Sequence, residues 1–167
     1  TQLQHFTAGK NRHINVLVLA PTRELAMQVR EVFHLFNTSL PQKVKTLAVV
    51  GGVSINPQMM ALQGVNVLIA TPGRLLELVE ANAVHLSDIH TLVLDEADKM
   101  LNLGFKEEMD RIFSLLPKRR QNLLFSATLS QDVNNITQFL LRDPLVFKIE
   151  PEVESIDLIT QLGYFVT

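Results

Sequence analysis

The sequence predicts an α/β fold with a doubly wound parallel sheet, and two alternating patterns carry that prediction. Short runs of Val, Leu and Ile recur without strict apolar–polar alternation, which indicates strands buried on both faces. Stretches of helical periodicity separate these runs, so right-handed crossovers are expected to join the strands. The expected strands are Val16–Ala20, Val44–Val50, Val67–Thr71, Thr91–Asp95, Asn122–Ser126 and Leu145–Ile149.

Three helices are expected between the strands, at Arg23–Phe36, Phe105–Leu116 and Ser130–Leu141. Ser130 is a suitable N-cap, because its hydroxyl can accept a hydrogen bond from a free amide of the first turn. Each helix carries an apolar stripe that should face the sheet. The stripes comprise Leu25, Val29, Val32, Phe33 and Phe36; then Phe105, Met109, Ile112, Phe113 and Leu116; then Val133, Ile136, Phe139 and Leu140.

Composition narrows the class of protein. The chain has 167 residues, of which 47% are hydrophobic and 19% charged, so an ordered domain with its own core is expected. It has no cysteine, which excludes disulfides and thiolate metal sites. No apolar run reaches the roughly 18 residues of a membrane span, and a cytoplasmic location is expected. The net charge of -2 argues against a broadly basic surface, so any contact with nucleic acid must be local.

The first domain is expected to cover residues 1–150. Residues 151–158 are acidic at several positions and show no clear periodicity, which is typical of a linker. Residues 159–167 contain a strand-like run and are interpreted as the start of a second domain.

Polar, glycine-bearing or charged residues follow five of the expected strands. Since ligands of open α/β sheets bind at the carboxyl ends of the strands, these residues should meet at one edge. They are Pro21-Thr22-Arg23, Gly51-Gly52, Thr71-Pro72-Gly73-Arg74, Asp95-Glu96-Ala97-Asp98 and Ser126-Ala127-Thr128.

The acidic segment after the fourth strand carries the sharpest signal. Four apolar residues followed by Asp95 and Glu96 form a Walker B pattern, in which a carboxylate holds Mg²⁺, directly or through water, beside nucleotide phosphates. The adjacent glutamate can orient and deprotonate the attacking water. An acidic turn that merely opens a helix is the alternative.

Together, these segments resemble the DEAD-box RNA helicases. Asp95 to Asp98 reads DEAD and resembles motif II of that family, and the other segments resemble four further motifs in the family's order. Those four are PTRELA at 21–26 (motif Ia), GG at 51–52, TPGR at 71–74 (motif Ib) and SAT at 126–128 (motif III). Residues 51–60 and 119–128 resemble the bacterial RhlE-type branch. The resemblance implies a RecA-like domain that uses ATP and Mg²⁺.

The resemblance also implies roles for individual residues in catalysis. Asp95 would hold Mg²⁺, Glu96 would activate the water, and Asp98 would bond to Ser126 and Thr128 to link hydrolysis to closure of two domains. A hydroxyl pair that caps the helix at Ser130 is the alternative for Ser126 and Thr128.

RNA would be held on its backbone, without base reading. The implied contacts are Pro21, Thr22, Arg23, Gly51, Gly52, Thr71, Gly73 and Arg74. Glycine lets backbone amides approach phosphate closely. Such contacts need few charges, which reconciles RNA binding with the slightly negative net charge.

The expected phosphate-binding loop, GxxxxGK[ST], does not occur in this sequence, because Gly9-Lys10 is followed by Asn11 and no glycine stands five positions earlier. The family's Q motif and second RecA-like domain are also missing, so the chain alone is expected to be inactive. In this fold the absent strand would lie between the strands ending at Ser126 and Ile149. A gap, a detached last strand, or a swapped dimer filled by Ile159–Val166 is expected.

Two other functions remain to be distinguished. A phospho-acceptor receiver domain is also doubly wound, but it needs an acidic pair where this sequence has Pro21-Thr22-Arg23. A module that binds RNA or a protein partner without ATPase activity is the second alternative. Comparing ATP binding by this chain and by a chain extended upstream would separate these cases.

Overall fold

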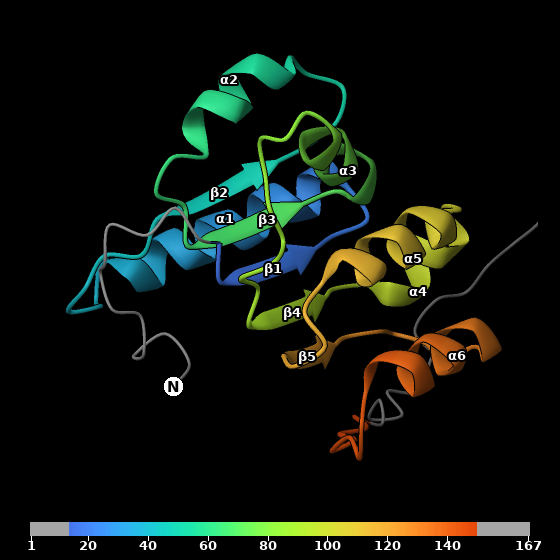
Figure 1. Ribbon diagram of the computed structural model, residues 1–167. Coiled ribbons are helices and arrows are strands. Elements are labelled where there is room, and N and C mark those ends of the chain that lie inside the picture. The colour runs from blue at the N-terminus through green and yellow to red at the C-terminus, as the bar shows by residue number, and fades with distance from the viewer. Residues whose placement is uncertain (1–13, 150–167) are drawn as a thin grey trace, which may run out of the picture.

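The computed structural model describes residues 14–149, in which a five-stranded parallel sheet is flanked by helices (Figure 1). The strands follow the order β2-β3-β1-β4-β5 across the sheet, which confirms the predicted doubly wound α/β fold. They are β1 (Val16–Leu19), β2 (Thr46–Val49), β3 (Val67–Ala70), β4 (Thr91–Leu94) and β5 (Gln121–Leu124). The helices are α1 (Arg23–Asn37), α2 (Ile55–Ala61), α3 (Pro72–Glu80), α4 (Ala97–Asn102), α5 (Lys106–Leu115) and α6 (Gln131–Leu140).

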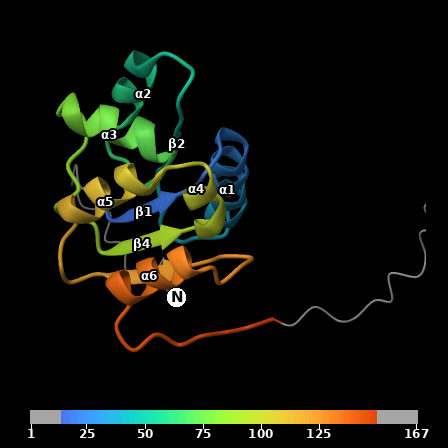
Figure 2. The same cartoon turned by 90° about the vertical axis from the view of Figure 1, so that its right-hand side faces the viewer.

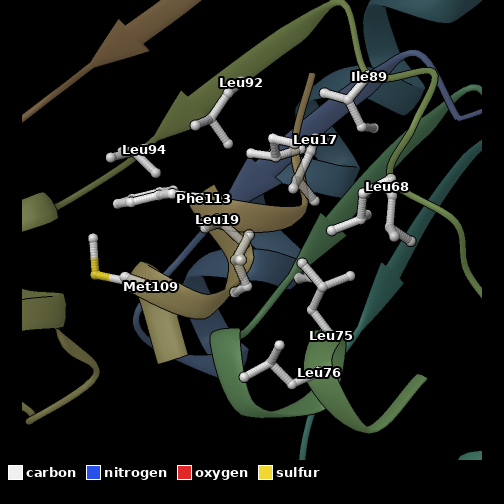
Figure 3. Packing of buried hydrophobic residues seen from close by; sticks show 14 of the residues in the cluster. Leu17, Leu19, Leu68, Leu75, Leu76, Ile89, Leu92, Leu94, Met109 and Phe113 are labelled. Carbon is white, nitrogen blue, oxygen red and sulfur yellow. The ribbon is translucent and has the colours of Figure 1, made fainter. Parts of the chain in front are cut away.

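The sheet buries apolar side chains on both faces. Along β1, Leu17 and Leu19 enter one core and Val18 the other, as the alternation of side chains in a strand requires, and Ala20 directly after the strand joins Val18. The larger core packs the sheet against α3, α5 and α6, and Figure 3 shows part of it around Leu19. The smaller core lies under α1, on the other side of the sheet (Figure 2).

The strand register aligns all five carboxyl ends. Leu19 is paired with Ala70 on one side and Leu94 on the other, and the pairs Val49–Ala70 and Leu94–Leu124 extend the row. Every segment that leaves a strand therefore starts from the same edge of the sheet, as predicted.

The three expected helices are confirmed to within one residue at each end, and Ser130 is the N-cap of α6. Three stripe residues do not face the core: Val32, Phe36 and Phe139 are 50%, 64% and 75% exposed. Phe36 lies in the last turn of α1, and this helix of roughly 22 Å is longer than the strands of roughly 13 Å. The last turn therefore extends beyond the sheet. Val32 lies beside the partly buried stripe of α1 and Phe139 beside the stripe of α6, and the ring of Phe139 is 6.5 Å from that of Phe113 and tilted by 34° to it.

The predicted strand at Leu145–Ile149 is wrong. The segment has no regular secondary structure and pairs with none of the strands within residues 14–149, and Leu145, Phe147 and Ile149 are each at least 87% exposed. β5 is consequently an edge strand within the described residues, and its side chains are partly exposed instead of buried on both faces. An apolar run becomes a strand only where a neighbouring strand satisfies its amides and carbonyls.

The predicted linker at 151–158, the second-domain start at 159–167 and the pairing role of Ile159–Val166 lie outside the described residues. So does Gly9-Lys10. Among residues 14–149, no helix has the length and apolar character that a membrane span requires.

Candidate nucleotide and nucleic-acid site

The sheet order divides the predicted site residues into two groups along one edge. Asp95–Asp98 and Ser126–Thr128 follow the neighbouring strands β4 and β5. Gly51-Gly52, Thr71–Arg74 and Pro21–Arg23 follow β2, β3 and β1, in that spatial order. The edge thus has an acidic and hydroxyl-bearing half beside a half that carries glycines and two arginines.

Asp95 is fixed in the acidic half by its backbone. Its amide donates to the carbonyl of Leu19 at 3.0 Å, and its Oδ1 accepts from the amide of Glu96 at 3.0 Å. Burial raises the pKa of the Asp95 carboxyl, the Glu96 amide opposes that rise, and the charge of Glu96 adds to it. Oδ2 accepts no hydrogen bond from residues 14–149, so one carboxylate oxygen is available for a cation or its water.

Glu96 has an unusual backbone conformation. Its φ of 49° and ψ of 53° lie in the left-handed region, which is strained for a residue with a side chain of this size. Its Oε2 lies 3.1 Å from Lys99 Nζ, one turn along α4, and it accepts no hydrogen bond of good geometry within the described residues. The turn therefore holds the carboxylate in place at the start of α4 without using it as a helix cap.

Asp98 joins the ends of β4 and β5. Its Oδ2 accepts from the Thr128 hydroxyl at 2.9 Å and from the Thr128 amide at 3.1 Å. Partial burial raises the pKa of the Asp98 carboxyl, but the side chains of Thr128 and Ser126 and the amides of Lys99 and Thr128 outweigh that effect and lower it. The Ser126 hydroxyl itself donates to the Thr128 carbonyl at 2.7 Å.

The alternative role for the hydroxyl pair, as a cap for α6, does not fit this geometry. Ser130 caps that helix with its own hydroxyl, which accepts from the Val133 amide.

In the other half of the edge, Thr22 and Arg23 begin α1. The Thr22 hydroxyl caps the helix by accepting from the Leu25 amide at 3.2 Å, and Pro21 precedes it. Arg23 is exposed, and its Nη1 donates to the carbonyl of Gly51 at 3.3 Å. Gly52 has a φ of 74°, a backbone conformation that favours glycine, and a Cβ there would lie 2.5 Å from Arg23 Nη1 and displace that guanidinium.

Thr71, Gly73 and Arg74 lie at the start of α3. Thr71 is buried, and its amide donates to the Val49 carbonyl, while the space around Gly73 is open. Arg74 is only 6% exposed: it donates to Glu77 Oε2 and to the Val53 carbonyl, each at 2.8 Å. Its side chain is therefore directed to the loop after β2, and its Nη1 is buried without a partner among residues 14–149.

A sequence model described as DEAD/DEAH box helicase matches residues 1–136. The chain belongs to this family. The predicted DEAD-box resemblance is thereby confirmed, and the receiver-domain alternative is excluded. The narrower assignment to the RhlE-type branch stays a prediction.

The chain is similar in sequence and fold to individual DEAD-box proteins, and it covers about a third of the length of each. It is 44% identical over 149 residues to the DEAD-box ATP-dependent RNA helicase CshA of Streptococcus pneumoniae, which is 89% of this chain and 28% of CshA. The crystal structure of the yeast DEAD-box splicing factor Prp28 matches 77% of the chain and 31% of that protein, with 33% identity and a TM-score of 0.71. A DEAD box protein from Methanococcus jannaschii matches 81% of this chain and 37% of its own, with 34% identity and a TM-score of 0.73. The fold is therefore that of a DEAD-box RecA-like domain.

Two residues near the DEAD-box motifs were not anticipated. Lys99 pairs with Glu96 at a spacing of three, which a helical reading of the sequence after the DEAD letters would have indicated. Gln58 on α2 bonds to the loop after β2, and nothing in its sequence surroundings signals this. Its neighbours on α2 include no charged residue.

Proposed function

We propose that this chain is part of an ATP-dependent RNA helicase that couples ATP hydrolysis to unwinding or remodelling of RNA duplexes. One observation carries the proposal: five motif-bearing segments leave aligned strand ends at one edge, with the acidic motifs on one half and the glycine and arginine motifs on the other. The chain spans less than a third of the length of CshA, so the activity proposed is that of a longer protein.

The acidic half is proposed to handle ATP. Within residues 14–149, no three His, Cys, Asp or Glu side chains are grouped as metal ligands, but the free Oδ2 of Asp95 fits a Mg²⁺ ion whose other ligands are phosphate and water oxygens. Bound Mg²⁺ would neutralise charge on the phosphates during transfer. Glu96 accepts the proton of the attacking water. Asp98, with Ser126 and Thr128, connects this half to movement of a second RecA-like domain.

The other half is proposed to hold the sugar–phosphate backbone of RNA. Thr22, Arg23, Gly51, Gly52, Thr71 and Gly73 stand at three neighbouring strand ends, together with Pro21 and Arg74. Contacts of this kind position RNA without reading its sequence. The net charge of -2 is compatible with them, since backbone amides supply part of the attraction.

In the parent protein, residues 1–150 are proposed to form most of the first RecA-like domain, followed by a linker at 151–158 and the second domain from 159. ATP phosphates would be held mainly by a loop outside this sequence. We therefore expect the isolated chain to be inactive, and we propose a cytoplasmic location for the parent.

Measurements of ATP binding test whether the ATP phosphates are held mainly by a loop outside this sequence. Calorimetry would compare ATP·Mg²⁺ binding by this chain with binding by a chain extended upstream through a GxxxxGK loop. Tight binding is expected only for the extended chain, because Asp95 alone offers no amide cradle for phosphates. Tight, stoichiometric binding by the 167 residues would contradict the proposal. If the extended chain binds RNA but never ATP, the non-enzymatic RNA-binding module is the better description.

A further inference from the structure

Hydrogen bonds from side chains, made mainly to carbonyl groups, hold the loop between β2 and α2 in place (residues 50–54, the β2–α2 loop). Gln58 Nε2 donates to the carbonyl of Val50 at 3.2 Å and to that of Ser54 at 3.1 Å. Gln58 Oε1 accepts from the Val50 amide at 2.9 Å. One side-chain amide therefore pairs with both backbone groups of Val50, as a neighbouring strand would, and closes the loop onto Ser54.

Two arginines bind two further carbonyls of the loop. Arg23 donates to Gly51 and Arg74 to Val53. Because Arg74 comes from α3 and Arg23 from α1, three helices converge on the carbonyl side of these five residues. Among them, Gln58 alone makes three hydrogen bonds to the loop.

Unlike most of the carbonyl groups, most N–H groups of the loop lack hydrogen-bond partners within the described residues. The N–H groups of residues 51–54 donate no hydrogen bond to any atom of residues 14–149. Gly52, Val53 and Ser54 are exposed, and the space around the Cα of Gly51 is open. Four successive unpaired amides beside the Arg23 guanidinium are suited to the oxygens of a phosphate group.

We propose that Gln58 is a positioning residue for RNA binding: by holding the Val50 and Ser54 carbonyls, it keeps the four loop amides free for RNA phosphate. This inference rests on the proposed RNA-binding function of the same loop. It extends that function to a residue outside the recognised motifs, and it gives Arg74 a similar supporting role. Gln58 itself touches the loop and not the nucleic acid.

The test uses the complete helicase and a fluorescein-labelled ten-nucleotide oligouridylate, with binding measured by anisotropy over a range of salt. Gln58→Leu removes all three hydrogen bonds at similar size. It is expected to raise Kd by about ten-fold or more, because each amide–phosphate hydrogen bond that is lost weakens binding severalfold. Gln63→Leu is the matched control: Gln63 is exposed on the segment after α2, and its side chain makes no hydrogen bond among residues 14–149. It should bind within about two-fold of the wild type.

Two further readouts separate positioning from a general structural defect. Amides carry no net charge, so the slope of log Kd against log salt concentration should stay as in the wild type while Kd rises. In the RNA-stimulated ATPase reaction, the RNA concentration for half-maximal rate should rise by the same factor as Kd, with the rate at saturating RNA retained.

Failure of the Gln58 inference and failure of the proposed RNA-binding function give different results. Binding by Gln58→Leu equal to that of Gln63→Leu would overturn the inference, and so would a loss of maximal ATPase rate in proportion to RNA affinity. If Gln58→Leu fails to fold, Gln58→Met, which is uncharged, close to glutamine in length and also loses both donated bonds, is judged by the same criteria. A wild-type protein that binds no oligouridylate would instead overturn the proposed function.

Discussion

The two halves of the carboxyl edge present their chemistry in opposite ways. At the ends of β4 and β5, side chains are the groups proposed to react: one carboxylate oxygen of Asp95 accepts no hydrogen bond within residues 14–149, and Glu96 is held in a strained turn. In the other half, the arginines that follow β1 and β3 bind carbonyls of the loop after β2, and the amides of residues 51–54 in that loop donate no hydrogen bond within residues 14–149. The anion-binding surface proposed for this half is compatible with a slightly acidic chain, since its donors would be largely peptide groups.

The largest effect is expected in the acidic half. Glu96→Gln in the complete helicase should lower the rate of ATP hydrolysis by about 10²- to 10⁴-fold, because an amide cannot accept the proton of water. Binding of ATP and RNA should persist. Steady-state ATPase assays and RNA anisotropy measure the two effects, and Glu107→Gln on the exposed face of α5 is the control. Hydrolysis at the wild-type rate would remove Glu96 from catalysis.

The arginines of the other half allow a sharper comparison. Arg23→Ala removes an exposed charge, so it should weaken binding of all RNA sequences alike and reduce the magnitude of the salt slope by about 1. Arg74→Ala leaves the Val53 carbonyl unpaired and should destabilise the fold by about 1–3 kcal/mol.

Because Arg74 is buried, its loss should weaken RNA binding with little change in the salt slope. Anisotropy titrations at several salt concentrations, with thermal unfolding of the same samples, provide the measurement. A slope that falls equally for both variants would mean that Arg74 reaches phosphate directly, as the sequence alone suggested.

Thr128→Val tests the connection between β4 and β5. It removes the hydroxyl donor to Asp98 and should lower the free energy of unfolding by about 0.5 kcal/mol, a small figure because the pair is exposed. RNA unwinding should fall more than ATP hydrolysis if this contact couples hydrolysis to unwinding.

The same contact should make stability depend on pH. The pKa of Asp98 is lowered in the folded state, so the stabilising effect of the ionised carboxylate is present above the usual value of 3.8 and is lost as pH falls below it. The difference in free energy of unfolding between Thr128→Val and the wild type should shrink over the same pH range. Chemical denaturation at pH 7 and pH 3 measures this difference.

Asp95→Asn should produce the smallest change in stability among these variants, and it should be stabilising. Burial raises the pKa of Asp95, so ionisation at pH 7 is less favourable in the folded chain than in the unfolded chain and lowers stability. Asparagine removes that penalty, and a small rise in melting temperature at pH 7 is expected together with loss of ATPase activity. The gain should disappear as pH falls through the raised pKa, where the wild-type carboxyl is neutral. A lower melting temperature at pH 7 would contradict this account.

The sequence allowed the strands and their functional ends to be predicted because the apolar runs stop abruptly at polar residues. Asp95 directly follows Leu94, and Gly51 comes soon after Val49, so the edge could be located without coordinates. Leu145–Ile149 has the same composition as a strand, yet it pairs with no strand of the described part of the chain. Pairing depends on a neighbour distant in sequence, which a local pattern does not contain.

The part of the site that could not be predicted concerns where side chains point. Arg74 looked like a phosphate ligand because it is basic and follows a strand, but its burial against Val53 results from packing between α3 and the β2–α2 loop. Gln58 carries no charge and belongs to no recognised motif, so its three bonds became visible only in the fold. α2, α3 and α4 also went unpredicted.

The left-handed backbone of Glu96 has a consequence for evolution under heat stress. A non-glycine residue at this φ raises the free energy of the native state by roughly 1 kcal/mol, and glycine or asparagine would adopt it with less strain. A population selected only for survival of the fold at high temperature should therefore accumulate these residues at position 96. On the role proposed for Glu96, only simultaneous selection for turnover would retain the glutamate at this position.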